Sequence, residues 1–599
     1  MCGLAAIYAY SGDAPPVNEA ALAACNARMI RRGPDAEGSW VSGDGRVGLA
    51  HRRLAIIDLD DRAAQPMSLT DGGPRIDITY NGEIYNFRAL RQQLQDQGQE
   101  FKTQSDTEVL LHLYRRDGAD MVRHLRGMFA FAIWDEEKRG MLLGRDAFGI
   151  KPLYYMDDGK TLFAASQVKA LLAGLGAMGR ATPSENPAAH AGFFLFGHVP
   201  EPLSLYKDIK ALPAGTTLWI DGGGAERETA YFDISHSLAE AEAMQSGATD
   251  LGALLRDSVA HHLVADVPVG VFLSAGLDSA TLVGLASEIK GASLDTLTLG
   301  FDEFAGTEND EVPLAEAVAD CYGTRQHTVR VAGTDFRDDL DDVFDVMDQP
   351  SIDGVNTYFV AKAAARAGLK VAISGAGGDE LFRGYDGFKQ IPALSRRMSR
   401  VPGGAGLGRA LRSLVQPLSA LGMPPKAAGL MEYGTRIGDA YLLRRALYMP
   451  WELEAGIKGV LDADLARAGL QELDVLARLD DCQSPVPADA GKVAALEMNF
   501  YMRGQLLRDA DWAGMAHSLE IRVPLIDRPL FAGLAGGLAG GNGPDKRAMA
   551  TTPATPLPNA VLNRPKTGFF VPVREWMSGD SSGDRGLRGW AQKVYQAQA

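Results

Sequence analysis

The sequence predicts an α/β and α+β protein of two domains, and three observations support this. The chain has 599 residues, which exceeds the usual length of a single domain. Up to about residue 215, short apolar runs separated by turn residues indicate stacked antiparallel sheets flanked by helices. From about residue 250, apolar strands alternate with helical segments, which indicates a doubly wound parallel sheet with helical additions.

The first domain is predicted over residues 2–215. Its strand-like runs are RVGLAHRRLAIID, IDITYNGEIYN, MFAFAIWDEEKRGMLLGRD and KPLYYMDDGKTLFAAS. Its helical runs are ALAACNARMIRRG, FRALRQQLQDQG and DTEVLLHLYRRDGADMVRHL, which have helical spacing and end near glycine. A last strand, GTTLWIDGG, leads into a polar stretch at about 222–228. We therefore expect a linker over 216–245.

The second domain is predicted over residues 246–599. Its expected strands are VPVGVFLS, LDTLTLGF, RQHTVRV and LKVAISG, with helical segments between them. A stretch rich in glycine and proline covers 401–426, and the segment after it is predicted to be helical to about residue 510. A second stretch rich in glycine, proline and alanine covers 532–558.

Charge and cysteine content narrow the classes of function. The net charge of −16 makes the chain a poor general binder of polyanions, which argues against nucleic acid but leaves a phosphate ligand open. Four cysteines without a CxxC pair fit a reducing compartment, so we expect the cytoplasm. No apolar run of about 18 residues predicts a membrane-spanning helix. The ten histidines form no metal-binding pattern.

Cys2 follows the initiator methionine directly. If Met1 is removed, a thiol and a free α-amine share one residue, so that the thiolate can attack and the amine can act as base. A cysteine at this position is by itself more often accidental. Arg53, the segment 81–83 and Asp106 strengthen the functional interpretation, because each lies at the end of a predicted strand or in a turn.

The motifs around these residues resemble class II glutamine amidotransferase domains, which are N-terminal-nucleophile hydrolases with an αββα sandwich. The motifs are MCGLA, RRGPDAEG, LAHRRLAIID, YNGEIYN, SDTEVLL and RDAFGIKPLYY. The resemblance implies that Cys2 attacks the carboxamide of glutamine. Asn81 and the backbone N–H of Gly82 would then form the oxyanion hole. In isolation, Asn81-Gly82 is more typical of a hairpin turn.

The same resemblance implies three residues that bind glutamine. Arg53 would pair with the substrate α-carboxylate, for which a planar guanidinium is well suited. Asp106 and Glu83 would hold the α-ammonium and the side-chain amide.

A loop of small residues follows the first strand of the second domain, in VGVFLSAGLDSATLVGLA. Its turn and first helical positions carry Ser274, Gly276, Asp278 and Ser279. Such a loop lets backbone N–H groups approach phosphate oxygens at a helix N-terminus, and Asp278 can reach a Mg²⁺ on the pyrophosphate. The chain has no G-x-x-x-x-G-K-[ST] motif, which excludes a Walker loop. A capped helix start is the alternative explanation.

This loop resembles the pyrophosphate loop of ATP pyrophosphatases, with Ala275 where that family usually has glycine. SGAGGDELFRGY, MAHSLEIRVPLID and LNRPKTGFFVPVREW complete the match. The resemblance implies a sheet of the adenine nucleotide alpha hydrolase type, with ATP as substrate and Mg²⁺ as cofactor. It assigns Mg²⁺ to Asp278 and Asp379 and the departing pyrophosphate to Lys566. The other ATP-binding positions that it implies are Leu273, Ser274, Gly276, Ser279, Leu299, Ser374 and Gly375.

The order of the two domains is similar to that of glutamine-hydrolysing asparagine synthetases of the B type. The resemblance covers nearly the whole chain, apart from about 390–490. Such enzymes form β-aspartyl-AMP from aspartate and ATP and use ammonia channelled from the glutaminase site, giving asparagine, glutamate, AMP and pyrophosphate. An enclosed apolar path favours neutral ammonia over ammonium. We therefore expect a carbon–nitrogen ligase of asparagine biosynthesis that acts on small molecules, with no nucleic-acid or membrane partner; a homodimer stays open.

Ala376 departs from this pattern. Family members often have Glu or Asp as the third residue of SG-x-G, beside the adenylate, and alanine cannot take a proton. Either another side-chain carboxylate takes the place of this residue, with Asp353 as a candidate, or the acceptor substrate is not aspartate. It would then be a different carboxylate, such as a sugar acid or a peptide side chain. An intramolecular cyclase and a non-enzymatic regulator are further alternatives. The intact Cys2, Asn81 and Asp106 argue against the cyclase, and catalytic groups at both ends argue against the regulator.

Overall fold

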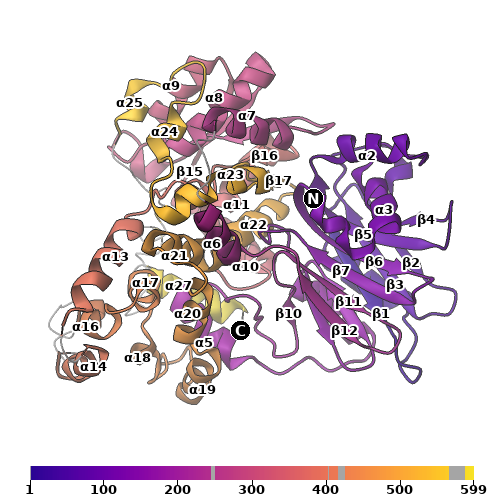
Figure 1. The fold of residues 1–599 in the computed structure, drawn as a ribbon, viewed down its shortest axis with the longest axis horizontal. Helices are drawn as coiled ribbons and strands as arrows, with labels where there is room; N and C mark the ends of the chain where they lie inside the picture. The colour runs from indigo at the N-terminus through magenta and orange to yellow at the C-terminus, as the bar shows by residue number, and fades with distance from the viewer. Residues whose placement is uncertain are drawn as a thin grey trace.

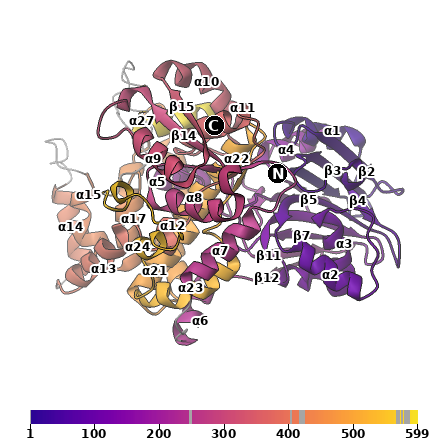
Figure 2. The same cartoon turned by 90° about the horizontal axis from the view of Figure 1, so that it is seen from above.

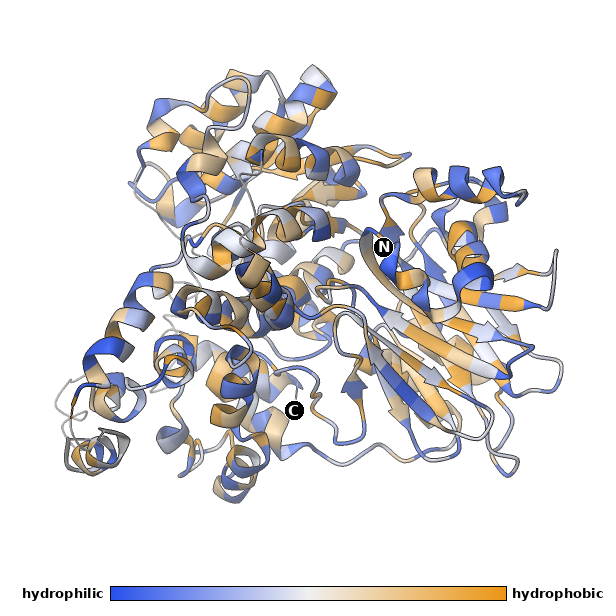
Figure 3. Ribbon diagram, in the orientation of Figure 1, coloured by the Kyte–Doolittle hydropathy of each residue, from blue (hydrophilic) through white to orange (hydrophobic). Residues whose placement is uncertain are grey.

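A computed structural model describes residues 2–244, 250–401, 404–415, 425–564, 572, 576 and 587–598. Figure 1 shows the sheets of the N-terminal part beside a C-terminal part that is richer in helices. Figure 3 shows hydrophobic residues gathered in the strands, whereas the outlying helix α2 (Phe87–Asp96) is mostly hydrophilic. The two-domain architecture predicted from the sequence is confirmed.

The described residues up to Ala230 form two antiparallel sheets of six strands each. Their orders are β10-β8-β9-β1-β3-β2 and β12-β11-β7-β6-β5-β4. The strands are β1 (Gly3–Tyr8), β2 (Ala36–Val41), β3 (Val47–Arg53), β4 (Met67–Leu69), β5 (Ile76–Ile84), β6 (Gly127–Asp135), β7 (Gly140–Arg145), β8 (Tyr154–Asp157), β9 (Leu162–Ala165), β10 (Lys210–Ala211), β11 (Thr216–Ile220) and β12 (Glu226–Ala230). Besides α2, the helices up to Ala230 are α1 (Glu19–Arg28), α3 (Asp106–Asp117), α4 (Val168–Ala177) and α5 (Pro187–Phe196), and α6 (Ile234–Met244) follows the last strand.

Strand β1 shows how side-chain alternation builds the layers. Leu4, Ala6 and Tyr8 lie in the core between the two sheets, together with residues of β6 and β7. Ala5 and Ile7 point the other way, into a separate core with α1 and α4. Helices α2 and α3 pack on the outer face of the second sheet. The layers are therefore helix, sheet, sheet and helix, which confirms the predicted αββα sandwich.

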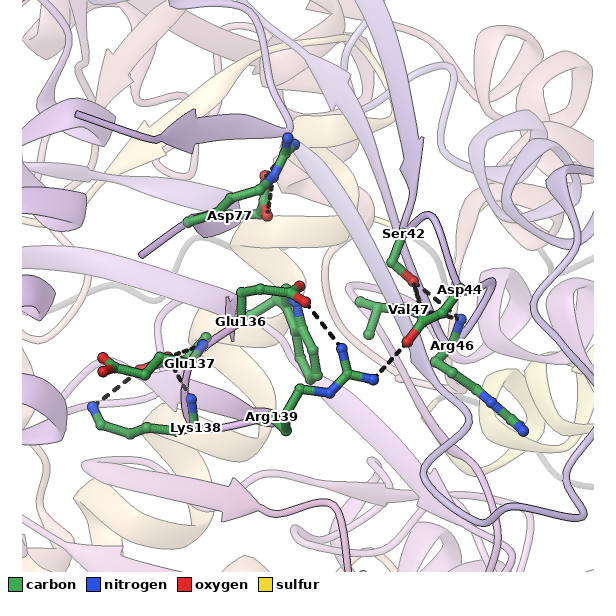
Figure 4. A network of polar contacts seen from close by, with 12 residues as sticks. Ser42, Asp44, Arg46, Val47, Asp77, Glu136, Glu137, Lys138 and Arg139 are labelled. Carbon is green, nitrogen blue, oxygen red and sulfur yellow. Dashed lines mark hydrogen bonds and ion pairs between the residues drawn. The ribbon is translucent and has the colours of Figure 1, made fainter. Parts of the chain in front are cut away.

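Charged residues join the turns at one end of this sandwich (Figure 4). Arg139, in the turn between β6 and β7, has a left-handed φ of 51°. Its guanidinium pairs with Asp44 of the β2–β3 turn at 2.6 Å and with Glu136 at 3.0 Å. These partners are partly exposed, so each pair contributes at most about 1 kcal/mol. The Arg139–Asp44 pair therefore joins the β6–β7 turn of one sheet to the β2–β3 turn of the other.

The second sheet extends past the predicted end of the first domain. Strand β11 pairs with β7, and β12 pairs with β11. The polar stretch expected in a linker is therefore the turn and start of a hairpin. Strand β12 has no apolar alternation because it is an edge strand with every residue exposed. The division into 2–215, 216–245 and 246–599 stays a prediction, and the sheet carries the first unit on to Ala230.

The described C-terminal residues form one parallel sheet of five strands. They are β13 (Val269–Phe272), β14 (Asp295–Phe301), β15 (Arg325–Val331), β16 (Val371–Ile373) and β17 (Glu520–Arg522). Their order is β15-β14-β13-β16-β17, so the chain reverses direction across the sheet between β13 and β16. The predicted doubly wound sheet is confirmed, although β17 was not predicted as a strand. Ligands bind at such switch points, outside the carboxyl ends of the strands.

Helices surround this sheet and extend away from it. They are α7 (Leu251–His262), α8 (Leu277–Lys290), α9 (Val312–Tyr322), α10 (Gly333–Val346), α11 (Val355–Arg366), α12 (Gly378–Leu381), α13 (Gly387–Met398), α14 (Gly404–Val415), α15 (Pro425–Ala428), α16 (Leu430–Tyr433), α17 (Ile437–Arg445), α18 (Pro450–Leu453), α19 (Ala463–Leu473), α20 (Val475–Gln483), α21 (Asp489–Leu496), α22 (Arg508–Met515), α23 (Arg528–Gly540), α24 (Lys546–Ala550), α25 (Asn559–Leu562) and α27 (Leu587–Gln598). A π-helix, Glu497–Leu507, joins α21 to α22. Helices α13 and α14 lie far from the N-terminal sandwich (Figures 1 and 2), which confirms the helical additions.

Candidate active sites

The N-terminal site comprises the residues predicted to act on glutamine: Cys2, Arg53, Asn81, Gly82, Glu83 and Asp106. Cys2 is buried directly before β1, and its backbone N–H donates to Oδ1 of Asn81 at 3.0 Å. Burial raises the pKa of the Cys2 thiol, so the protonated form dominates at neutral pH. The thiol therefore needs a base before it can act as a nucleophile.

Asn81 and Gly82 lie inside β5 and not in a turn, so the hairpin alternative is wrong. The Nδ2 group of Asn81 is buried and has no hydrogen-bond partner among the described residues. A buried donor without a partner is costly, which marks it as available to a ligand. A Cβ atom at Gly82 would overlap the carbonyl oxygen of Met128, because β5 and β6 run close together here.

Strand pairing places Arg53 next to Cys2. Gly3 pairs with Arg52, so the same register sets Arg53 opposite Cys2 at the strand ends. The Arg53 guanidinium donates to the carbonyl oxygens of Asp60, at 3.1 Å, and of Asp58. These bonds hold the side chain in a fixed direction.

Asp106 and Glu83 flank the same end of β5. Asp106 is the first residue of α3, not a strand end, and its carboxylate accepts from the Tyr80 hydroxyl at 2.9 Å and from the Ile84 N–H at 3.0 Å. Burial raises the pKa of Asp106. Burial and the charges of Glu520 and Asp106 raise the pKa of Glu83 well above its usual value. Its Oε2 lies 3.6 Å from the Arg522 guanidinium, so Glu83 faces the second domain.

Arg32 and Asp511 also belong to this site, although neither was predicted from the sequence. The Nε of Arg32 donates to the Cys2 carbonyl oxygen at 3.1 Å. Its two terminal nitrogens bind both carboxylate oxygens of Asp511, on α22, at 2.7 and 3.1 Å. The motif RRGPDAEG contains Arg32, but its partner lies 479 positions away in the chain. Cys2 is thus linked through Arg32 to the second domain.

The C-terminal cavity lies at the switch point of the parallel sheet and has a volume of about 2,120 Å³. This exceeds the roughly 300–1,000 Å³ of most small-molecule sites, so two substrates fit together. Every described residue that was predicted for ATP, metal or acceptor lines it: Leu273, Ser274, Gly276, Asp278, Ser279, Leu299, Asp353, Ser374, Gly375, Ala376 and Asp379. Lys566 lies outside the described residues.

The loops after β13 and β16 touch each other across this cavity. The Ser279 hydroxyl donates to the carbonyl oxygens of Ser274 and Gly276 at 3.1 and 3.2 Å, which closes the first loop onto the start of α8. A Cβ atom at Gly378 would lie 2.6 Å from Cγ of Asp278. Only glycine lets the second loop come this close. The N-terminal N–H groups of α8 therefore face a space bordered by both loops.

Asp278 and Asp379 fit a nucleotide-bound Mg²⁺. The ammonium of Lys546 lies 2.6 Å from an oxygen of each, so the two oxygens are at most twice that distance apart. The described residues contain no group of three or more metal-ligating side chains. Two carboxylates suit Mg²⁺, which in nucleotide sites takes its remaining ligands from phosphate and water.

Ala376 and Asp353, predicted for the acceptor, both line the cavity. Ala376 offers no ionisable group. Burial raises the pKa of Asp353, and burial and the charge of Asp353 raise that of Asp509. Asp509 accepts from the Ser351 hydroxyl at 2.9 Å and from Nε1 of Trp512 at 2.7 Å. The charges of Asp353 and Asp509 therefore interact beside the cavity.

Sequence reasoning missed Glu380 and Arg445, which also line the cavity. Burial and the charges of Asp379 and Glu497 raise the pKa of Glu380 to about 8. Arg445 pairs with Glu497 at 2.7 Å and stacks over the ring of Tyr501. Glu380 follows Asp379 in the quoted motif, but no sequence signal marks Arg445.

The π-helix and α22 run between the two sites. Tyr501 and Gln505 face the C-terminal cavity. Arg503 donates to the carbonyl oxygen of Phe148 at 3.1 Å, and Arg508 donates to that of Val199 at 2.6 Å. With Asp511 bound to Arg32, one helical segment contacts both halves of the protein.

None of the described helices is long and apolar enough to cross a membrane.

Comparison with protein families completes these observations. The glutamine amidotransferase domain family matches residues 1–232, and the asparagine synthase family matches residues 250–594. This chain belongs to the asparagine synthase family.

Relatives in that family align along most of the chain. Asparagine synthetase [glutamine-hydrolyzing] 1 of Bacillus subtilis is 31% identical over 100% of this chain and 90% of its own. A putative asparagine synthetase [glutamine-hydrolyzing] of Mycobacterium bovis is 33% identical, and the alignment covers 96% of this chain and 88% of that protein. Asparagine synthetase B [glutamine-hydrolyzing] of Escherichia coli is 32% identical, and the alignment covers 65% of this chain and 66% of that protein.

A solved glutamine phosphoribosylpyrophosphate amidotransferase from B. subtilis, with ADP and GMP, aligns at 16% identity over 55% of this chain and 65% of its own chain. The TM-score is 0.29, which is too low to inform the fold.

Proposed function

We propose that this chain is a glutamine-dependent asparagine synthetase, a carbon–nitrogen ligase. It would hydrolyse glutamine in the N-terminal site and use the ammonia to amidate aspartate, activated by ATP in the C-terminal cavity. The products are asparagine, glutamate, AMP and pyrophosphate. One observation carries the proposal: every described residue expected to bind ATP, metal or acceptor lines a single cavity at the switch point of the sheet.

In the N-terminal site, we assign the attack on glutamine to Cys2. Once Met1 is removed, the α-amine takes the thiol proton as sulfur attacks the carboxamide carbon. The oxyanion would accept hydrogen bonds from Nδ2 of Asn81, which has no described partner, and from the Gly82 N–H. The amine returns the proton to the leaving ammonia, and water then hydrolyses the thioester to glutamate. Arg53, Glu83 and Asp106 would position the substrate.

In the C-terminal cavity, the acceptor carboxylate attacks the α-phosphorus of ATP, which forms an acyl-AMP and releases pyrophosphate. Ammonia then attacks the acyl carbon, and AMP leaves. The loop residues Ser274 to Ser279 and the start of α8 would hold the phosphates. Mg²⁺, held by Asp278 and Asp379, would offset the charge of the pyrophosphate. The role of Lys566 stays a prediction.

A second candidate is a ligase that amidates a different carboxylate. Ala376 favours it, because this cavity position carries no group that binds an ammonium. If aspartate is the acceptor, the carboxyl pair of Asp353 and Asp509 is the proposed substitute, since it can take the proton that ammonia loses on attack.

Exchange of labelled pyrophosphate into ATP separates the two candidates. The protein would be given Mg²⁺ and either aspartate or one of a panel of other carboxylic acids. Exchange that depends on aspartate supports the first candidate. Exchange with another acid alone supports the second and rules out the first.

Three further expectations stay predictions: the cytoplasmic location, a homodimer, and the domain division. For the last, we propose that the glutaminase domain ends near Ala230, where its second sheet ends.

A further inference from the structure

Lys546 is the first residue of α24, and no sequence motif gave it a role. Its ammonium contacts Oδ2 of Asp278 and Oδ1 of Asp379, each at 2.6 Å. The lysine side chain is 16% exposed and the two carboxylates are similarly sheltered. A positive charge thus sits between the two carboxylates proposed as metal ligands.

The surrounding structure holds this lysine in place. Arg383 donates to the carbonyl oxygens of Gly541 and Gly543, in the turn before α24. The Asp545 side chain caps α24 by accepting from the Ala548 N–H at 2.9 Å. Helix α24 in turn packs on α8, which carries Asp278.

Gly384 gives further support. A Cβ atom there would overlap Cε of Lys546 and a carboxylate oxygen of Asp379. No side chain at position 384 is compatible with the lysine in this position. The loop after β16 is therefore shaped to admit the Lys546 side chain.

We propose that Lys546 is a resident counter-ion that holds the place of Mg²⁺ until the nucleotide arrives. The inference rests on the proposed function, because it takes Asp278 and Asp379 as the metal ligands. Two negative carboxylates this close repel each other, and a cation between them offsets that repulsion. The ammonium supplies that charge in the nucleotide-free protein.

The charge balance explains why metal and nucleotide would enter together. Mg²⁺ alone would have to displace the ammonium and leave it sheltered without a partner, which is costly. The phosphates of ATP offer the displaced ammonium a new partner. Metal affinity is therefore low without nucleotide and high with it, and by linkage the metal raises nucleotide affinity by the same factor.

Binding of Mn²⁺, followed by electron paramagnetic resonance, tests this without turnover. It would be measured with and without α,β-methylene-ATP. In the wild type, we expect the analogue to tighten Mn²⁺ binding strongly. Lys546→Met should tighten nucleotide-free Mn²⁺ binding by at least about tenfold, since a competing charge is gone. Lys389→Met is the matched control: Lys389 lines the same cavity, has no described bond to either aspartate, and should leave binding unchanged.

Two results would overturn the proposal: full Mn²⁺ affinity in the nucleotide-free wild type, or unchanged nucleotide-free affinity in Lys546→Met. Thermal unfolding shows whether Lys546→Met folds. If it does not, the Mn²⁺ affinity of the nucleotide-free wild type still tests the proposal. The variants Asp278→Asn and Asp379→Asn distinguish failure of the counter-ion role of Lys546 from failure of the proposed metal assignment. If both retain nucleotide-dependent Mn²⁺ binding, the metal assignment itself fails; if both lose it while Lys546→Met changes nothing, only the counter-ion role fails.

Discussion

In the N-terminal site the proposed catalytic groups already touch one another, whereas in the C-terminal cavity they line a space of about 2,120 Å³. Cys2, Asn81 and Arg32 form one chain of hydrogen bonds around the start of β1. Among the described residues, the ammonium of Lys546 bridges Asp278 and Asp379. The first site is therefore built for one small substrate, and the second leaves the arrangement of two substrates and a metal to be completed on binding.

Removal of the proposed nucleophile, Cys2, should have the largest effect of the changes considered. Cys2→Ala should lower glutamine-dependent amide synthesis by more than about ten-thousandfold, because no other group forms the thioester. Synthesis from added ammonium salt should continue, since the C-terminal cavity is intact. Product formation with each nitrogen source measures this. Loss of both activities would mean that the two sites do not act separately.

Asp278→Asn is the matching change in the C-terminal cavity. It should lower ATP–pyrophosphate exchange by about a thousandfold, because one of the two carboxylates proposed to bind the metal is lost. Glutamine hydrolysis should remain. Asp386→Asn, an exposed aspartate at the start of α13 without a side-chain cap bond, is the control. Full exchange in Asp278→Asn would refute its assignment as a metal ligand.

Asn81→Ala tests the buried amide of the N-terminal site. The loss of one oxyanion donor should lower glutaminase kcat by roughly a hundred- to a thousandfold. Glutamate release measures the effect, and ammonia-dependent synthesis is the internal control. If kcat is preserved and only KM rises, Asn81 binds the ground state and does not stabilise the oxyanion.

Arg32→Gln tests the link between the two halves. Arg32 and Asp511 are only 2% and 5% exposed, so the change leaves a buried carboxylate without its partner. The free energy of unfolding should fall by about 3–5 kcal/mol. Urea denaturation measures it. An unchanged midpoint would show that the pair does not hold the domains together.

Arg31→Gln should have the smallest effect. The neighbouring pair of Arg31 and Asp342 also joins the two halves, but its members are 48% and 32% exposed. The same urea measurement should show a loss below about 1 kcal/mol. A loss as large as that of Arg32→Gln would mean that burial does not decide the strength of these pairs.

Much of both folds could be predicted because local patterns determine them. Alternation along β1 and the apolar runs before the two loops suffice to indicate the sandwich and the parallel sheet. Strand β12 was missed because an edge strand with both faces exposed needs no apolar residues. Strand β17 was missed because three residues carry too little periodicity.

The site residues divide in the same way. Cys2, Asn81 and Asp278 lie in short motifs with local geometry. Asp511 and Lys546 could not be predicted, because each acts through a partner several hundred positions away and only the packing of helices brings them together.

In the proposed reaction, one chain moves the amide nitrogen of glutamine onto an activated aspartate. Incubation with glutamine labelled with ¹⁵N in the amide, together with ATP, Mg²⁺ and aspartate, tests it by mass spectrometry. We predict asparagine that carries the label, with AMP and pyrophosphate in equal amounts. Glutamate release without labelled asparagine or AMP would contradict the claim.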